Sequence, residues 1–169
     1  TARDLGAVGK GAACDAAVAS YKESGVDRAV VSVGGSVGLY GEKPWGQLWQ
    51  VSVRNPDTEG SLGVLSLSGG FLSTSGSYEK QFTEDGVTYH HILDPQTGLP
   101  AQTDLTSATI VGQSSMDADA LATALIVMGK EKALAFCEEK GLDAMLIDWE
   151  DQVFCTQGFA EKYALEVAP

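Results

Sequence analysis

The sequence predicts an α+β fold, and three observations support this prediction. The chain has 169 residues, an ordinary length for one domain, so it can bury a core without disulfide or metal support. Hydrophobic residues make up 44% of it and charged residues 20%, which is typical of globular proteins. Helical and strand patterns are mixed without regular alternation, and neither a repeat nor a low-complexity linker divides the chain. We therefore expect a single domain over residues 1–169.

The first half of the chain predicts one helix and three strands. An alanine-rich segment at 8–24 favours a helix, and Gly25 marks its end. The apolar run at 29–33 predicts a short buried strand. The glycines Gly34-Gly35 close it, either as a tight turn or to let a ligand approach the backbone. Two further strands are expected at 48–53 and 63–67, with a turn at Asn55-Pro56-Asp57 between them.

The second half predicts two helices and four strands. Residues 116–128 are apolar nearly all round, which indicates a deeply buried helix with Leu121, Leu125 and Val127 in the core. Another helix is expected at 130–139, where Gly141 stops it. The strands are expected at 88–93, 107–112, 144–149 and 152–156, the last two as a hairpin.

Charge, apolar runs and cysteine usage exclude several classes of function. Lys and Arg number 11 and Asp and Glu 23, so the net charge is −12, and a chain this acidic repels nucleic acid. No apolar run approaches the roughly 20 residues of a membrane helix. The cysteines Cys14, Cys137 and Cys155 have no CxxC spacing. We expect buried free thiols rather than a zinc site, with one disulfide as the alternative.

A glycine-rich stretch, DLGAVGKG at 4–11, leads into the first predicted helix. Backbone N–H groups and the helix dipole at such an entry suit a phosphate, and Lys10 adds a positive charge. The order differs from the GxxxxGKS or GxxxxGKT of a Walker A loop. The stretch is therefore a candidate anion site, and an ordinary glycine-rich helix entry is the alternative.

Two adjacent histidines, His90 and His91, are the only histidines of the chain and precede an Asp94-Pro95 turn. Neighbouring side chains in a strand point to opposite faces, so at most one of the two is expected to face a site. A structural or exposed role for the pair is the alternative to a catalytic one.

An acid and a hydroxyl share one face of the helix predicted at 116–128. Asp119 and Thr123 are four residues apart. A carboxylate on an apolar helix is costly to bury unless it is paired, and carboxylate and hydroxyl oxygens are hard ligands that suit Mg²⁺. The alternative for Asp119 is a capping or dipole role near the helix N-terminus, which we expect for Asp117.

Five segments in order resemble the FAD:protein FMN transferases, the ApbE family. They are DLGAVGKG at 4–11, VSVGGSVGLYG at 31–41, STSG at 73–76, HHILDPQTGLPA at 90–101 and DADALATAL at 117–125. The resemblance runs from Asp4 to about Gly129 and implies an ApbE-like mixed sheet with packed helices. It also implies an Mg²⁺-dependent enzyme that splits FAD, releases AMP and joins FMN to a Thr or Ser hydroxyl of an acceptor protein.

The resemblance implies roles for particular residues. The Mg²⁺ ligands would be the Ala7 carbonyl, the Asp119 carboxylate and the Thr123 hydroxyl. The positions that contact FAD would be Asp4, Lys10, His91 and Ile92. Candidates for taking the proton of the acceptor hydroxyl are His91 and Asp94.

The resemblance also implies export or a lipid anchor, in the periplasm or on the outer face of the membrane. The acceptors would be subunits of membrane redox complexes. Family members are considerably longer, so we expect a processed or engineered fragment that lacks the family's N-terminal part and some flavin contacts. For the 169-residue chain alone we expect weak binding of Mg²⁺ and FAD and little or no FMN transfer. An FAD pyrophosphatase and a flavin-binding fragment without turnover are the alternatives.

Overall fold

An antiparallel sheet of six strands forms the centre of the described part of the protein. The structure is a computed structural model that describes residues 4–56, 60–163 and 165–167. The strand order is β1-β2-β5-β8-β9-β10, and every neighbouring pair is antiparallel. The strands are β1 (Ala29–Val33), β2 (Ser36–Tyr40), β5 (Gly70–Gly76), β8 (Leu105–Gly112), β9 (Asp143–Asp148) and β10 (Val153–Cys155). This architecture confirms the predicted α+β class.

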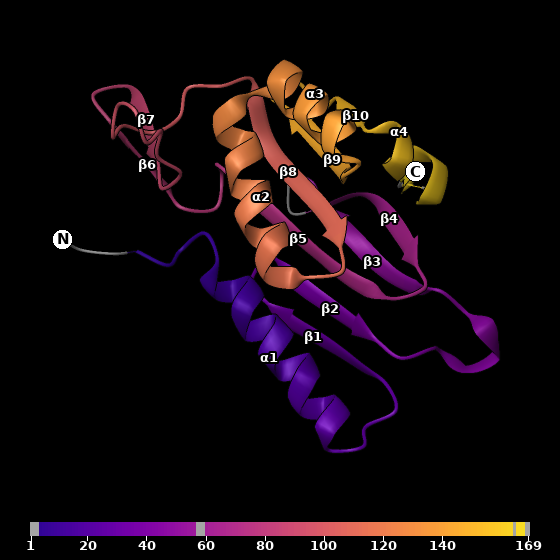
Figure 1. Cartoon of the computed structure of the whole chain (residues 1–169). Coiled ribbons are helices and arrows are strands. Elements are labelled where there is room, and N and C mark those ends of the chain that lie inside the picture. Colours follow the sequence, from indigo (N-terminus) through magenta and orange to yellow (C-terminus); the bar gives the residue numbers. More distant parts are fainter. Residues whose placement is uncertain (1–3, 57–59, 164, 168–169) are drawn as a thin grey trace.

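Three helices cover one face of this sheet, and a second sheet covers the other. In Figure 1, α2 lies between α1 and α3 on the helical face. The helices are α1 (Gly9–Glu23), α2 (Ser115–Met128) and α3 (Lys130–Lys140). The opposite layer consists of β3 (Trp49–Arg54), β4 (Ser61–Leu67), β11 (Leu165–Val167) and the short helix α4 (Gln157–Lys162).

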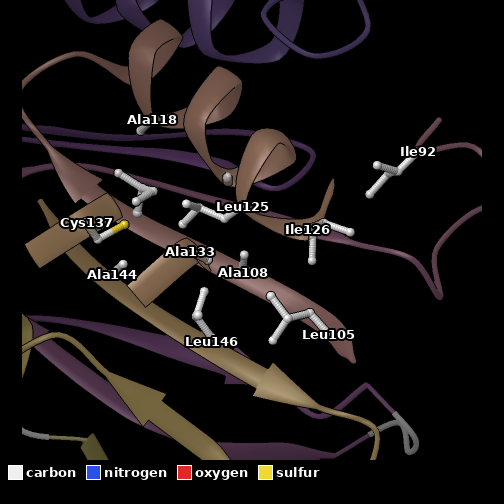
Figure 2. Close-up of a cluster of buried hydrophobic side chains, with 12 residues drawn as sticks. Ile92, Leu105, Ala108, Ala118, Leu125, Ile126, Ala133, Cys137, Ala144 and Leu146 are labelled. Carbon is white, nitrogen blue, oxygen red and sulfur yellow. The ribbon is translucent and has the colours of Figure 1, made fainter. Parts of the chain in front are cut away.

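The two central strands β8 and β9 are buried on both faces, which explains their nearly continuous apolar sequence. Alternate residues such as Ala108 and Leu146 pack against α2 and α3, as Figure 2 shows. The residues between them, such as Val111 and Met145, pack against the second sheet. The sheet therefore has a hydrophobic core on each side.

Both predicted long helices form, with the expected signals at their ends. Gly25 follows α1 at φ +73°, and its N–H donates to the Lys22 carbonyl at 3.1 Å. Ser114 caps α2 by accepting from the Asp117 N–H at 3.2 Å. The apolar character of α2 follows from its place between two helices and the sheet. Of its predicted core residues, Leu125 is fully buried, while Leu121 and Val127 are half-buried against the core.

The helix α3 and the predicted closing hairpin also form. Gly141 ends α3 in the left-handed conformation, at φ +62°. The hairpin consists of β9 and β10, which pair antiparallel as expected. The three cysteines are free thiols, and two of them, Cys14 and Cys137, are fully buried.

Two predicted strands differ from the structure. The segment 29–33 is a strand but lies at the edge of the sheet, so Val30 is 53% exposed instead of buried. The strand expected at 88–93 ends at His90, in β7 (Val87–His90). Within the described residues, this strand pairs only with β6 (Gln81–Glu84), in a hairpin that projects from the body in Figure 1. Residues 91–100 form a loop instead, closed by a bridge between Leu93 and Pro100.

Several elements had no clear sequence signal. Strands β2 and β5 are rich in Gly and Ser, and α4 and β11 are short. Gly34 has φ +58° in the turn between β1 and β2, so the Gly34-Gly35 pair makes a tight turn. Of the turn predicted at 55–57, Asp57 lies outside the described residues. Within the described part of the chain, none of the helices combines the length and apolarity needed to cross a membrane.

Candidate functional site

The N-terminal turns of α1 and α2 touch at Gly11. A side-chain carbon added to Gly11 would lie 2.6 Å from the Met116 Cα and closer still to the Ser115 carbonyl. Only a glycine lets the two backbones approach this closely without a shift. The glycine-rich entry at 4–11 therefore serves helix packing, whatever else it binds.

The carboxylate of Asp119 is the charged group at this contact. Its side chain is 0% exposed. Oδ2 accepts from the Gly11 N–H at 2.9 Å, so Asp119 caps α1, the neighbouring helix, rather than its own. Asp119 therefore has a capping role, as the alternative stated, but it caps the N-terminus of α1 and not that of its own helix, α2.

An ion pair holds the other oxygen of this carboxylate. The Lys10 ammonium lies 2.9 Å from Asp119 Oδ1 and also donates to the Gly6 carbonyl at 3.2 Å. Among the described residues, this ammonium is the polar partner of Oδ1, and no further group donates a hydrogen bond to that oxygen. A buried carboxylate needs such a partner because desolvation of its charge is costly. The ammonium thus lies between a carboxylate and a backbone carbonyl, a position that suits a cation.

Asp15 makes the reciprocal contact from α1 to α2. Its Oδ1 accepts from the Ser115 N–H at 2.9 Å and its Oδ2 from the Met116 N–H at 3.0 Å. These donors belong to the first turn of α2 and have no partner within that helix. The two helices are therefore fixed at their N-termini by each other's carboxylates.

Thr123 lies one turn further along α2. Its hydroxyl donates to the Asp119 carbonyl at 3.1 Å and is 2.9 Å from the Ser75 hydroxyl on β5. Ala7 is exposed in the turn that precedes α1. Asp4 is exposed as well, and its Oδ1 accepts from the Gly6 N–H at 2.6 Å. The structure thus places Asp4, Ala7 and Lys10 at the entry of α1, and Asp119 and Thr123 on successive turns of the adjoining helix α2.

The residues at this place fit a hard cation such as Mg²⁺. The proposed donors are a carboxylate, a backbone carbonyl and a hydroxyl, all oxygen ligands. The buried Oδ1 of Asp119 already faces a positive charge, and no further described group donates a hydrogen bond to it. Among the described residues, no three His, Cys, Asp or Glu side chains gather, so a cation would depend on this mixed oxygen set. That the three oxygens share one cation stays a prediction.

The two histidines have different surroundings, as their adjacency in a strand predicted. His90 is buried, and its Nε2 donates to the Ala101 carbonyl at 3.0 Å while its Nδ1 accepts from the Ile92 N–H at 3.3 Å. It thereby ties together the two ends of the loop 91–100. His91 is exposed at the start of this loop. Partial desolvation lowers the pKa of His91 although its side chain is largely exposed, and the neighbouring Lys80 charge lowers it further, so the neutral ring predominates at pH 7.

The other candidate residues of this loop have structural partners. Asp94 Oδ1 accepts from the Gln96 N–H at 2.8 Å, which shapes the turn before Gly98. The Ile92 side chain is 4% exposed and belongs to the core cluster in Figure 2. Its carbonyl accepts from the Ala101 N–H at 3.0 Å. The flavin contact expected at Ile92 and the proton transfer expected at Asp94 stay predictions.

The loop 91–100 and the Lys10–Asp119 pair are both anchored to α2. Thr103, just beyond the loop, donates through its hydroxyl to the Ile126 carbonyl at 2.9 Å. In the described part of the chain, no hydrogen bond or ion pair directly joins His91 to Lys10 or Asp119. A cavity of about 260 Å³ lies elsewhere, between β3 and the large sheet. Gly34 and Gly35 line it, but none of the residues expected to bind metal or FAD does.

Sequence reasoning missed three of the residues that build the site. Gly11 ends the glycine-rich stretch and Asp15 follows it in α1, but their partners on α2 come about 100 residues later. No spacing rule reveals a pair so far apart. The role of His90 was hidden by its neighbour His91, which occupies the histidine position of the family motif. The rule that neighbouring side chains in a strand point to opposite faces was the one available signal.

These features define an α+β domain with a carboxylate–lysine pair at a glycine-rich helix entry. The chain belongs to the ApbE family, whose sequence profile matches residues 2–146. It is 40% identical to the FAD:protein FMN transferase of Treponema pallidum (strain Nichols), over 94% of this chain and 47% of that protein. It is 37% identical to the protein of the same name from Escherichia coli (strain K12), over 90% of this chain and 44% of the relative.

Solved structures give the same result for the fold. The ApbE protein of Thermotoga maritima superimposes with a TM-score of 0.87 at 34% identity, over 94% of this chain and 52% of that one. The apo flavinyl transferase ApbE of Pseudomonas stutzeri superimposes with a TM-score of 0.81 at 34% identity, over 97% of this chain and 52% of that one. The chain spans about half the length of the curated relatives that it matches.

Proposed function

We propose that this chain contributes the cation- and phosphate-binding part of an FAD:protein FMN transferase. The observation that carries the proposal is the buried carboxylate of Asp119, paired with Lys10 at the glycine-rich entry of α1. The names of relatives at 37–40% identity support the same activity. The proposed reaction moves FMN from FAD to a Thr or Ser hydroxyl of an acceptor protein and releases AMP.

In this reaction the acceptor oxygen attacks the phosphorus of the FMN half of FAD. A new P–O bond forms, the bond to the AMP phosphate breaks, and the hydroxyl proton passes to a base. Asp119, Thr123 and the Ala7 carbonyl would hold Mg²⁺, which when bound neutralises charge on the pyrophosphate and the leaving AMP. Lys10 lies at the same helix entry and would pair with a phosphate oxygen. These charges favour departure of AMP.

His91 is our candidate for the base. Its lowered pKa leaves a ring nitrogen free of a proton at pH 7, and its exposed position is open to an acceptor side chain. Asp94 is the second candidate, although one of its oxygens already accepts from Gln96. His91→Gln should lower transfer while FAD binding persists. Asp94→Asn distinguishes the two, because it retains an acceptor for the Gln96 N–H.

The test is to measure FAD binding, AMP and acceptor-linked FMN with and without Mg²⁺. We expect FAD binding that Mg²⁺ strengthens, and slow release of AMP, because the chain spans about half the length of its relatives. Asp119→Ala should abolish the Mg²⁺ effect, and Asp117→Ala, an exposed acid two residues away, should retain it. The absence of FAD binding, or binding indifferent to Mg²⁺, contradicts the proposal. Release of AMP together with free FMN would identify a pyrophosphatase. FAD binding without release of AMP would identify a flavin-binding module.

We also propose that the acceptors are subunits of membrane redox complexes and that the protein acts in the periplasm or on the outer membrane face. The family resemblance alone supports both statements. Fractionation of cells that express the natural gene tests the location. Mass spectrometry for FMN on Thr or Ser residues of membrane proteins, with and without that gene, tests the acceptors. A cytoplasmic location, or an unchanged set of flavinylated proteins, contradicts them.

A further inference from the structure

Lys10 occupies the position that a cation at Asp119 would take. Its ammonium is 2.9 Å from the buried Asp119 Oδ1 and 3.2 Å from the Gly6 carbonyl, one residue before the expected ligand Ala7. Two positive charges cannot share one carboxylate oxygen at short distance without strong repulsion. A bound divalent cation and this ammonium therefore compete for the same atom.

The lysine side chain has access to solvent that the aspartate lacks. Its side chain is 37% exposed, whereas that of Asp119 is 0% exposed. Asp119 stays in place because its other oxygen accepts from the Gly11 N–H at 2.9 Å. The stem of Lys10 passes over the Gly34 turn, where any side chain would crowd the lysine Cδ. One partner of the pair is thus buried and held by a backbone hydrogen bond, and the other is partly exposed to solvent.

We propose that Lys10 is an exchangeable counter-ion that neutralises Asp119 until a divalent cation binds and then moves to an anionic ligand. In the metal-free protein the ammonium stabilises the buried carboxylate. Binding of the cation releases the ammonium at the edge of the site, where it pairs with a phosphate oxygen. Cation and phosphate ligand therefore bind cooperatively, and each strengthens the other equally. The phosphate part of this inference rests on the proposed function, and the exchange itself does not.

The first experiment measures Mg²⁺ alone by calorimetry, on the unmodified chain and on Lys10→Met. The variant should bind Mg²⁺ roughly tenfold more tightly, because the competing charge is gone. The control Lys22→Met removes a lysine from the other end of α1 and should leave Mg²⁺ affinity unchanged. Equal affinities in the unmodified chain and Lys10→Met would overturn the exchange.

The second experiment observes the unmodified chain and uses a variant only to assign a signal. The side-chain ammonium signals of ¹⁵N-labelled lysine are followed by NMR as Mg²⁺ is added, with the Lys10 signal assigned by its absence in Lys10→Met. We expect this signal to shift or vanish at saturation, while the Lys22 signal stays. A Lys10 signal that is unchanged at saturating Mg²⁺ would show that the ammonium remains at Asp119, and the proposal would fail.

The third experiment separates the exchange from the proposed function. Affinity for FAD is measured with and without Mg²⁺ in the unmodified chain and in Lys10→Met. Mg²⁺ should strengthen FAD binding more in the unmodified chain, because only there does it release a lysine. Equal strengthening in both proteins overturns the cooperative step. If neither protein binds FAD, the proposed function fails, and the Mg²⁺ and NMR results still decide the exchange.

Discussion

Asp15 of α1 and Asp119 of α2 each accept backbone N–H groups from the other's helix. Asp15 receives the Ser115 and Met116 N–H groups, and Asp119 receives that of Gly11. Each carboxylate also lies at the positive end of the other helix dipole. The pair therefore fixes both the spacing of the helices and the charge at the candidate cation site.

Asp15→Ala should destabilise the protein by about 1–2 kcal/mol, because two N–H donors of α2 lose their acceptor. Chemical denaturation measures the loss. Asp117→Ala, which removes an exposed acid from the first turn of α2, is the control and should cost less. Equal losses of unfolding free energy in the two variants would show that the hydrogen bonds from Asp15 to α2 stabilise the protein no more than Asp117 does.

Gly11→Ala should destabilise the fold by about 1–3 kcal/mol, because the added carbon meets the Ser115 carbonyl and forces the helices apart. The same shift should weaken Mg²⁺ binding, since Asp119 is held by the Gly11 N–H. In the matched variant Gly9→Ala, the added carbon has its nearest neighbour, Leu5 Cβ, at 4.0 Å. Gly9→Ala should retain both the stability and the Mg²⁺ binding of the unmodified chain. If Gly11→Ala is as stable as Gly9→Ala, the packing argument is wrong.

Leu125→Ala should cost about 2–5 kcal/mol of unfolding free energy, since it leaves a cavity between α2 and the sheet. Leu125 is 0% exposed and lies at the centre of the cluster in Figure 2. Met116→Ala on the same helix is the control, because Met116 is 43% exposed. A denaturant midpoint that is unchanged by Leu125→Ala would refute the assigned core position.

The stability of the protein should fall below about pH 4 through Asp148. Burial raises the pKa of this carboxyl. The Gln152 N–H, the Lys130 ammonium and the Glu150 N–H outweigh that effect, so its pKa lies below the ordinary 3.8. A lowered folded-state pKa stabilises the fold above pH 3.8, and this contribution is lost as the pH falls through the folded-state value.

Unfolding measured from pH 5 to pH 2 tests this contribution. Asp148→Asn should flatten the acid-side slope of stability against pH. Lys130→Met should flatten it only in part, because the two N–H donors to Asp148 remain. If stability falls with pH as steeply in Asp148→Asn as in the unmodified protein, the acid sensitivity comes from other carboxylates.

Local signals predicted the parts of the fold that depend on local energetics. Alanine content and Gly25 define α1, and the apolar run at 116–128 defines α2, because helix propensity and end signals act within a few residues. Strands β2 and β5 were missed because their burial comes from neighbouring strands, not from their own composition. Ser36 and Ser73, for example, are both 0% exposed and share a hydrogen bond of 2.8 Å.

The sequence predicted that Asp119 and Thr123 share a helix face, but it did not predict their contacts. The i, i+4 spacing of Asp119 and Thr123 placed them on one helix face, as expected from helix geometry. Their actual partners, Lys10 and Ser75, come from other elements, and no rule of local spacing identifies them. Burial of the His90 ring and its two bonds to the loop 91–100 likewise depend on the tertiary fold.

The long separation between Asp15 and its partners has a consequence for biosynthesis. The residues that Asp15 caps follow it by 100 positions or more, and Asp119 follows Gly11 by 108. At ordinary rates of translation, α1 leaves the ribosome roughly 5–20 s before α2. During that interval the Gly11 N–H of α1 lacks its Asp119 acceptor. A cation site that depends on Asp119 would therefore form only after α2 has been synthesised, and metal retention would report on chains completed at least to that point.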